Sequence, residues 1–266
     1  MSFPGTFAPA LFSSTSVEQV FSLEVTTTSP NQQMSFTTGA DGLMDIYWGD
    51  GDSDLATMVT TPTHTYVVAG TYNLKMSGLT TALALNTTLG KVALTGVLSP
   101  IRGMPALTDV TNLFFNNTNI VGSIPAGFFD DCPLITTFYY AFLNSTFTGP
   151  CPRIFDNNTL ATIFYRCFYG CDIESVPSGL FDNNSLVTDF NGLFQNCNTL
   201  LTAPSDLITI GKHPSVNNLG FTYYGCTGLT STVPELWVDF PAATHTSCFK
   251  NSLSIANYAD IPAGWK

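Results

Sequence analysis

Charged side chains are scarce in this chain. Only 10% of its 266 residues are Asp, Glu, Lys or Arg, whereas a typical globular domain has about 25%. Eight Lys and Arg stand against 19 Asp and Glu, which gives a net charge of −11 at pH 7. Proteins bind phosphate backbones and anionic lipid surfaces through clustered cations. This balance therefore argues against nucleic acid or a membrane as a partner.

Long apolar runs are also missing. No stretch of the sequence contains the roughly 18 consecutive apolar residues that indicate a transmembrane helix. The first twelve residues have no basic residue and contain Pro4 and Pro9, so we expect no secretory leader. Residues 1–22 are instead expected to form an extended arm that attaches to a partner subunit, or else packs back on the sandwich or adds its first strand. The apolar side chains of this candidate attachment arm are Phe3, Phe7, Leu11 and Phe12.

Residue types that carry chemistry are few. The chain has three histidines and seven cysteines. An odd number of cysteines does not suggest a disulfide framework, so we expect free thiols and folding in a reducing compartment. His245 and Cys248 are three residues apart, but the sequence places no carboxylate to orient the imidazole. We therefore expect no enzyme, no cofactor and no metal centre.

A repeated pattern runs from Pro100 to the C-terminus, in which an aromatic residue precedes a small residue by three positions. The aromatic residues are Phe114, Phe142, Phe168, Phe194, Tyr223 and Phe249, at steps of 28, 26, 26, 29 and 26 residues. The small residues are Asn117, Ser145, Cys171, Cys197, Cys226 and Ser252. A period of this length predicts a solenoid with one buried column of rings. Cys171, Cys197 and Cys226 are expected to form a ladder of buried free thiols rather than a metal site.

One copy of this pattern carries a more specific motif. Leu186, Phe190, Leu193 and Phe194 recur at helical spacing and predict a helix over 185–196. The stretch Val187-Thr-Asp-Phe-Asn-Gly-Leu-Phe-Gln-Asn-Cys-Asn-Thr-Leu200 resembles the core of the leucine-rich repeats in BspA-like surface proteins. The resemblance covers about 99–266 and implies about six leucine-rich repeats.

A second motif occupies residues 34–78. Its turn and hairpin residues are Trp48, Gly49, Asp50, Gly51, His64 and Tyr66. Together with Gly70-Thr71-Tyr72 they resemble the turn and hairpin of a polycystic-kidney-disease-type (PKD) β-sandwich module. Asp45, Asp50, Asp52 and Asp54 suggest a calcium loop, but their spacing lacks the glycine and glutamate of an EF-hand. We favour a turn in which Asp side chains accept hydrogen bonds from local amides, and a calcium ion stays an open alternative.

The expected fold class is α+β. The predicted segments are the arm (1–22), a PKD-like β-sandwich (23–80), a connector or cap (81–98) and the leucine-rich-repeat solenoid (99–266).

The expected function is non-enzymatic structure or recognition on a bacteriophage virion surface, as a capsid decoration, head fibre or tail-fibre accessory. Modules of extracellular type without a leader, anchor or disulfides favour a protein that folds in the host cytoplasm and is assembled there. The arm and sandwich would bind other virion proteins within an oligomeric assembly, and the solenoid would bind a host surface glycan or protein. The alternative is an extracellular bacterial adhesin with leucine-rich repeats.

Overall fold

The computed structural model describes residues 19–86 and 93–266, and strands dominate its regular structure. Eleven strands are β1 (Phe21–Thr27), β2 (Gln32–Ser35), β3 (Thr37–Thr38), β4 (Met44–Tyr47), β5 (Ser53–Thr57), β6 (Thr63–Tyr66), β7 (Gly70–Gly78), β8 (Leu83–Ala84), β9 (Ala93–Val97), β10 (Gly149–Pro150) and β11 (Ile173–Ser175). The helices are α1 (Leu236–Asp239) and the short 3-10 turns η1 (Tyr258–Asp260) and η2 (Ala263–Trp265). The predicted attachment-arm residues Phe3, Phe7, Leu11 and Phe12 lie outside the described residues.

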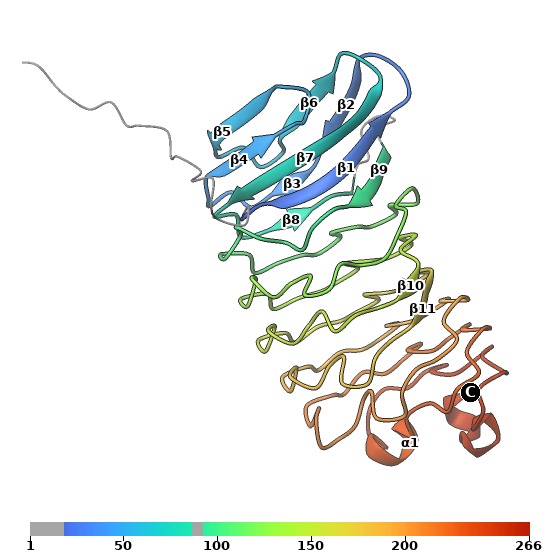
Figure 1. Cartoon of the computed structure of the whole chain (residues 1–266). Coiled ribbons are helices and arrows are strands. Elements are labelled where there is room, and N and C mark those ends of the chain that lie inside the picture. The colour runs from blue at the N-terminus through green and yellow to red at the C-terminus, as the bar shows by residue number, and fades with distance from the viewer. Residues whose placement is uncertain (1–18, 87–92) are drawn as a thin grey trace, which may run out of the picture.

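The N-terminal part is built from antiparallel sheets (Figure 1). One sheet has five strands in the order β5-β4-β7-β1-β9, and two smaller sheets pair β2 with β6 and β3 with β8. Alternate side chains of β1 (Phe21, Leu23 and Val25) are fully buried, as expected for a strand with one face toward a core. Strands β8 and β9 lie within the segment proposed as a connector and pair with β3 and β1.

The C-terminal part is built from turns. Successive passes of the chain lie against one another beyond β9 and extend away from the sheets (Figure 1). Neighbouring passes are joined mainly by single parallel bridges, and β10 and β11 pair as two short parallel strands. The bridged pairs are Ala82–Asp109, Asp109–Thr137, Thr137–Ile163, Ile163–Asp189, Ser175–Thr202, Asp189–Asn218 and Asn218–Thr244.

The segment predicted to be a helix, 185–196, consists of turns, so that prediction was wrong. Its backbone N–H groups alternate between two kinds of acceptor. Leu193 donates to Phe190 three residues earlier, whereas Phe194 donates to Thr222 in the next pass. Gly192 and Asn196 also have φ angles of 64° and 61°, in the left-handed region that a right-handed helix excludes. The inward side chains have the spacing expected of a helix, but alternate backbone hydrogen bonds go to the next pass instead of continuing along the segment.

The predicted fold class and the leucine-rich-repeat solenoid were also wrong. The described residues are 4% helix and 23% strand, which makes the chain essentially all-β rather than α+β. No solenoid of regular strands or helices is found in residues 19–86 and 93–266, where backbone contact between passes consists of single bridges, the short β10–β11 pair and turn-to-turn hydrogen bonds. The repeated pattern in the sequence therefore reflects side chains that point inward from turns.

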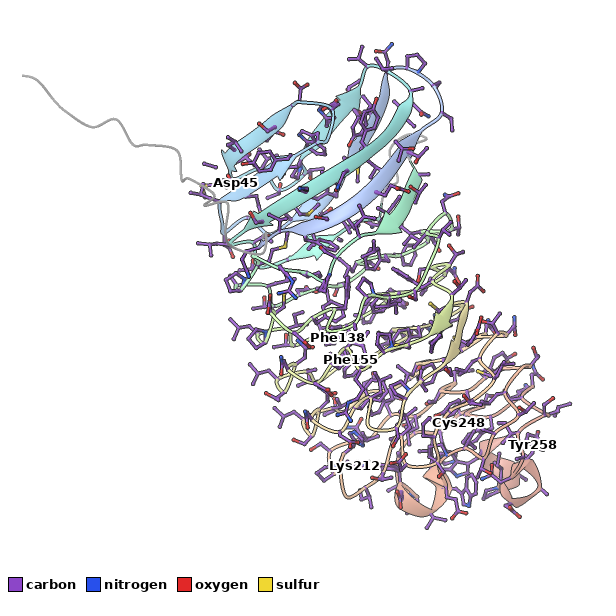
Figure 2. The ribbon with its side chains drawn as sticks, viewed as in Figure 1. Asp45, Phe138, Phe155, Lys212, Cys248 and Tyr258 are labelled. Atoms are coloured by element: carbon purple, nitrogen blue, oxygen red, sulfur yellow. The ribbon has the colours of Figure 1, made fainter. Side chains whose placement is uncertain are left out.

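Aromatic rings fill the interior of the turn region. The rings of Phe142 and Phe168 are 5.1 Å apart and those of Phe168 and Phe194 are 5.7 Å apart, nearly parallel in both cases. Phe138 and Phe155, labelled in Figure 2, form a second contact with centroids 4.7 Å apart. The core also joins the two parts of the molecule, because Phe21 of β1 contacts Phe128 of the turn region at 5.9 Å. The sheets and the turns thus share one apolar interior.

Candidate functional site

The turn between β4 and β5 brings two acids toward β6. Gly49 and Gly51 shape this turn with φ angles of 90° and 108°. These values suit glycine, because a Cβ disfavours the left-handed region. At Gly49 there is also no room for a side chain, since a Cβ would lie 2.7 Å from the backbone oxygen of Asn73. The chain therefore passes close to β7 and directs Asp50 and Asp52 toward His64.

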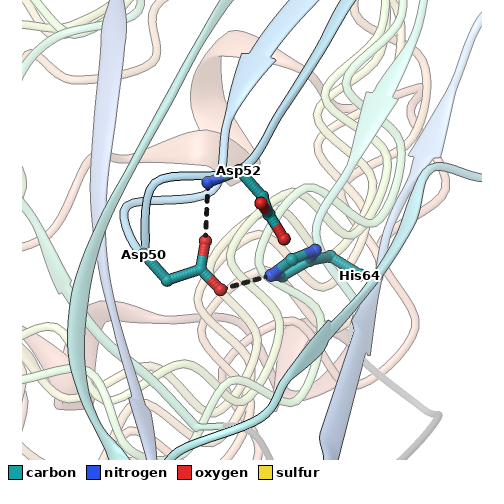
Figure 3. A group of neighbouring side chains, drawn as sticks. All are labelled: Asp50, Asp52 and His64. Carbon is teal, nitrogen blue, oxygen red and sulfur yellow. Dashed lines mark hydrogen bonds and ion pairs between the residues drawn. The ribbon is translucent and has the colours of Figure 1, made fainter.

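Asp50, Asp52 and His64 form a compact cluster, shown in Figure 3. The Nε2 atom of His64 is 2.7 Å from Oδ2 of Asp50. The other Asp50 oxygen, Oδ1, accepts a hydrogen bond of 3.2 Å from the Asp52 amide. One potential ligand atom from each of the three residues lies within 4.8 Å of the others. This donor set, one imidazole and two carboxylates, is one that could hold a metal ion.

The His64 ring is held in place by its neighbours. It stacks on the Trp48 indole, with centroids 4.8 Å apart and an interplanar angle of 13°. The edge of Tyr66 contacts it at 4.7 Å. Tyr66 is itself fixed, because its buried hydroxyl donates a 3.0 Å hydrogen bond to the carbonyl of Trp48. The residues singled out as the PKD-like turn therefore form one packed group around the imidazole.

The charge on Asp50 is stabilised by this group. Burial alone would raise the pKa of Asp50, but the hydrogen bonds from His64 and from the Asp52 amide outweigh it. The net result is a pKa below the ordinary value of an aspartate. The carboxylate is therefore ionised at neutral pH.

A cavity of about 440 Å³ adjoins the same turn. Its lining residues are Val20, Tyr47, Gly49, Gly51, Asp52, Asn73 and Lys75. Asp52 therefore belongs to both the cavity wall and the cluster.

A second candidate region, which the sequence analysis did not identify, lies in the C-terminal part that is built from turns. It is a group of four half-buried tyrosines and one half-buried arginine. We call Tyr139, Tyr140, Tyr165, Arg166 and Tyr169 the tyrosine cluster. The rings of Tyr139 and Tyr165 stack at 4.8 Å across neighbouring passes. The guanidinium carbon of Arg166 is 5.3 Å from the Tyr165 ring centroid and 5.4 Å from that of Tyr169, within the range of cation–π contacts.

The backbone of the tyrosine cluster is strained. Tyr140 has a φ of 58° and Arg166 a φ of 48°, both in the left-handed region. Non-glycine residues in this region cost free energy and are concentrated at functional sites. Asn112 and Ser247 have φ angles of 61° and 51° at the corresponding positions of other passes, so this conformation belongs to the turn that the passes share.

Polar atoms without protein partners lie beside the rings. Nε of Arg166 and Oε1 of Gln195 are buried and make no hydrogen bond within the described residues. Both lie near Gly192 of the same pass as Gln195, since a Cβ there would be 3.1 Å from Gln195 Oε1 and 3.4 Å from Arg166 Nε. Next to them, the Asn196 amide donates a 3.0 Å hydrogen bond to the Tyr169 hydroxyl.

The hydroxyl groups of Tyr139 and Tyr140 interact with each other. A hydrogen bond with Tyr140, together with burial, raises the pKa of Tyr139 to about 12. The same hydrogen bond lowers the pKa of Tyr140 below its usual value, and the Arg166 charge adds to this effect. The Tyr139 phenol is therefore protonated at neutral pH.

The predicted ladder residues lie in the interior. Tyr223 and Phe249 stack at 5.5 Å, and Tyr223 also stacks on Phe194 at 5.6 Å. The Cys197 thiol donates to the carbonyl of Phe168, and the Cys226 thiol donates to that of Phe194. All seven cysteines are free and buried. Burial raises the pKa of the Cys171 thiol to about 11 and that of the Cys226 thiol to about 12.

His245 and Cys248 do not form a catalytic pair. Nδ1 of His245 is 2.8 Å from the carbonyl oxygen of Ala243, and its ring stacks on Trp265 at 4.2 Å. Burial raises the pKa of the Cys248 thiol to about 12, so the nucleophilic thiolate is not formed at neutral pH.

Compared with known protein families and with curated proteins, the chain matches none. The resemblances to leucine-rich-repeat and PKD-type families are corrected on this ground, and no relative or family supports the bacteriophage assignment that accompanied them. No helix in the described part of the chain has the length and apolar character needed to cross a membrane.

Proposed function

We propose that the protein is a non-enzymatic recognition protein that binds a surface carbohydrate on the tyrosine cluster. The observation that carries this proposal is the contrast between two sets of aromatic residues. Rings such as Phe142, Phe168 and Phe194 are fully buried and explained by packing. Tyr139, Tyr165 and Tyr169 lie on the outside of the same passes, half-buried, where packing of the core does not require them.

The chemistry of the cluster suits a ligand with flat apolar faces and hydroxyl edges. Tyrosine offers a large, rigid contact surface with a polar tip, at low cost in conformational entropy. A sugar ring has C–H faces that pack on such rings and hydroxyls that both donate and accept. The Arg166 guanidinium adds a cationic donor group beside the rings of Tyr165 and Tyr169.

The charge of the chain favours a neutral carbohydrate over a nucleic acid. Aromatic residues beside an arginine also stack on nucleic-acid bases. However, such binding draws most of its affinity from clusters of cations, and this chain has eight Lys and Arg against 19 Asp and Glu.

The absence of catalysis is part of the proposal. The buried thiols have raised pKa values, and the imidazole of His64 is bonded to Asp50. A place on a phage particle or on a bacterial surface stays a prediction, as do attachment through the N-terminal arm and assembly into an oligomer.

An array of immobilised neutral and charged glycans tests the proposal. The wild-type chain is expected to bind a subset of neutral glycans, and a Tyr139→Ala/Tyr165→Ala variant with an unchanged melting temperature is expected to lose that signal. A Tyr258→Ala variant serves as control, because Tyr258 is a half-buried tyrosine far along the chain that contacts Lys266. Binding confined to nucleic acids, or equal binding by the double variant, would refute this function.

A further inference from the structure

The four acids of the β4–β5 hairpin have different roles. Asp54 accepts a 3.1 Å hydrogen bond from the indole Nε1 of Trp48. Asp45 accepts a 2.9 Å hydrogen bond from the amide of Ala56. Both of these carboxylates therefore fasten the hairpin itself. The side chains of Asp50 and Asp52 are directed toward His64 instead, from the turn toward β6 (Figure 3).

Asp52 differs from the other three acids. Its carboxylate accepts no hydrogen bond from the described residues, and its side chain is exposed. The structure of the hairpin does not require an acid at this position. The pair beside it is more sheltered, with 11% of the His64 side chain and 18% of the Asp50 side chain exposed.

We propose that Asp50, Asp52 and His64 bind one divalent transition-metal ion of the zinc type. The imidazole decides the class of ion, because Ca²⁺ and Mg²⁺ take oxygen ligands whereas Zn²⁺ accepts a mixture of imidazole nitrogen and carboxylate oxygen. Each residue supplies one ligand atom, and the fourth position of the ion faces solvent. This site does not depend on the carbohydrate-binding proposal.

The rearrangement that the ion requires is small. A tetrahedral ion with bonds of about 2.0–2.2 Å holds its ligand atoms roughly 3.3 Å apart. The contact between His64 Nε2 and Asp50 Oδ2, now 2.7 Å, must open slightly. The third ligand atom, from Asp52, starts no more than 4.8 Å from the others and closes by rotation of an exposed side chain.

Binding uses the lone pair of His64 Nε2. The ring binds the ion as the neutral tautomer that carries its proton on Nδ1, so a ring that carries the proton on Nε2 gives it up while Nδ1 takes one up from solvent. The ring is already oriented by Trp48 and Tyr66, so little conformational entropy is lost. The ion would connect the β4–β5 turn to β6 and so stabilise the folded chain.

Calorimetric titration of the full chain with Zn²⁺ tests the site. We expect saturable binding of one ion per chain and a higher melting temperature in the presence of Zn²⁺. Since loss of a partner outside the ligand shell already costs about 10–100-fold in metal affinity, Asp52→Asn is expected to weaken binding by at least about 10-fold. Its melting temperature without zinc should equal that of the wild type, because Asp52 makes no hydrogen bond through its side chain.

Two controls locate the ion. Asp54→Asn removes the same charge from the same hairpin but keeps an acceptor for the Trp48 indole, and it is expected to bind Zn²⁺ within about twofold of the wild type. In a chain with Trp237→Phe and Trp265→Phe, Cu²⁺ is expected to quench the fluorescence of Trp48, which stacks on His64. Asp52→Asn should reduce this quenching.

Either of two results overturns the proposal. The first is the absence of saturable Zn²⁺ binding up to about 1 mM, the weak limit of specific affinity. The second is undiminished binding by Asp52→Asn, which would assign the ion to the thiols or to the protein surface.

Discussion

His213 is a neutral, buried imidazole in the turn region. Its Nε2 donates a 3.0 Å hydrogen bond to the carbonyl of Phe181, and its Nδ1 accepts from the Thr209 amide at 3.3 Å. Burial lowers the pKa of His213 below the ordinary value of 6.5. The unfolded chain therefore binds more protons than the folded chain just below that value, and the free energy of unfolding falls as the pH drops through it.

This pH dependence is testable by urea unfolding between pH 7 and pH 5. We expect His213→Asn to flatten the decline, because an Asn amide keeps a donor and does not titrate. Asn184 shows that the substitution fits, since its amide donates to the carbonyl of Phe155 in the same way one pass earlier. An unchanged slope in His213→Asn would mean that other groups cause the decline.

Phe194 is fully buried between Phe168 and Tyr223. Truncation of a buried Phe to Ala leaves a cavity and costs about 3–5 kcal/mol. We expect Phe194→Ala to lower the free energy of unfolding by this amount in urea titrations. Leu253→Ala is the reference, because the Leu253 side chain is 71% exposed; a loss below about 1 kcal/mol for Phe194→Ala would contradict the burial of this ring.

At the scale of elements, the β4–β5 turn allows a matched comparison of two glycines. Gly49→Ala combines a φ of 90° with a Cβ only 2.7 Å from a backbone oxygen of Asn73. Gly51→Ala has an unfavourable φ of 108° but meets no atom within 4 Å. Strain at a residue of this kind costs about 1–3 kcal/mol. Thermal unfolding should therefore show a larger loss for Gly49→Ala than for Gly51→Ala, and the reverse order would be inconsistent with the close approach of the turn to β7.

The elements also show how far the sequence alone could predict this structure. The alternation of buried residues in Met44–Tyr47 and the following Gly-Asp-Gly are local signals, and they indicated a strand and a turn. The prediction of a helix over 185–196 was wrong because a helix and a series of turns can both place apolar side chains inward at this spacing. Only the backbone hydrogen bonds to the next pass distinguish the turns from a helix. The predictions of an α+β fold class and of a solenoid were wrong for the same reason.

The sequence alone indicated the two candidate sites to different degrees. Asp50 and His64 were singled out as turn and hairpin residues, but their contact joins positions 14 residues apart and needed the fold. The tyrosine cluster was missed, although Tyr139, Tyr140, Tyr165 and Tyr169 recur in neighbouring copies of the pattern. The inward position is aromatic in every copy, whereas the outward position of Tyr139 and Tyr165 is not aromatic in the other copies and carries no repeated signal.

At the scale of the whole molecule, the sheets lie at one end and the turn region extends from them to η2 (Figure 1). The last pass is covered by this short helix, where the Phe249 amide donates to the carbonyl of Trp265. The contact of Phe21 with Phe128 joins the interiors of the two parts. The tyrosine cluster and the Asp50–Asp52–His64 cluster thus belong to different parts of one continuous body, and a change in one is expected to leave the other intact.

The central claim is that the tyrosine cluster is a binding surface. Its most direct test is calorimetric measurement of the affinity of wild-type and Tyr165→Ala chains for the glycan that binds most strongly on the array. Truncation of an aromatic side chain that anchors a binding partner costs more than about 1 kcal/mol, so we predict a loss of at least about 5-fold for Tyr165→Ala, with Tyr258→Ala unchanged. Equal affinities for wild-type and Tyr165→Ala chains of equal stability would contradict it.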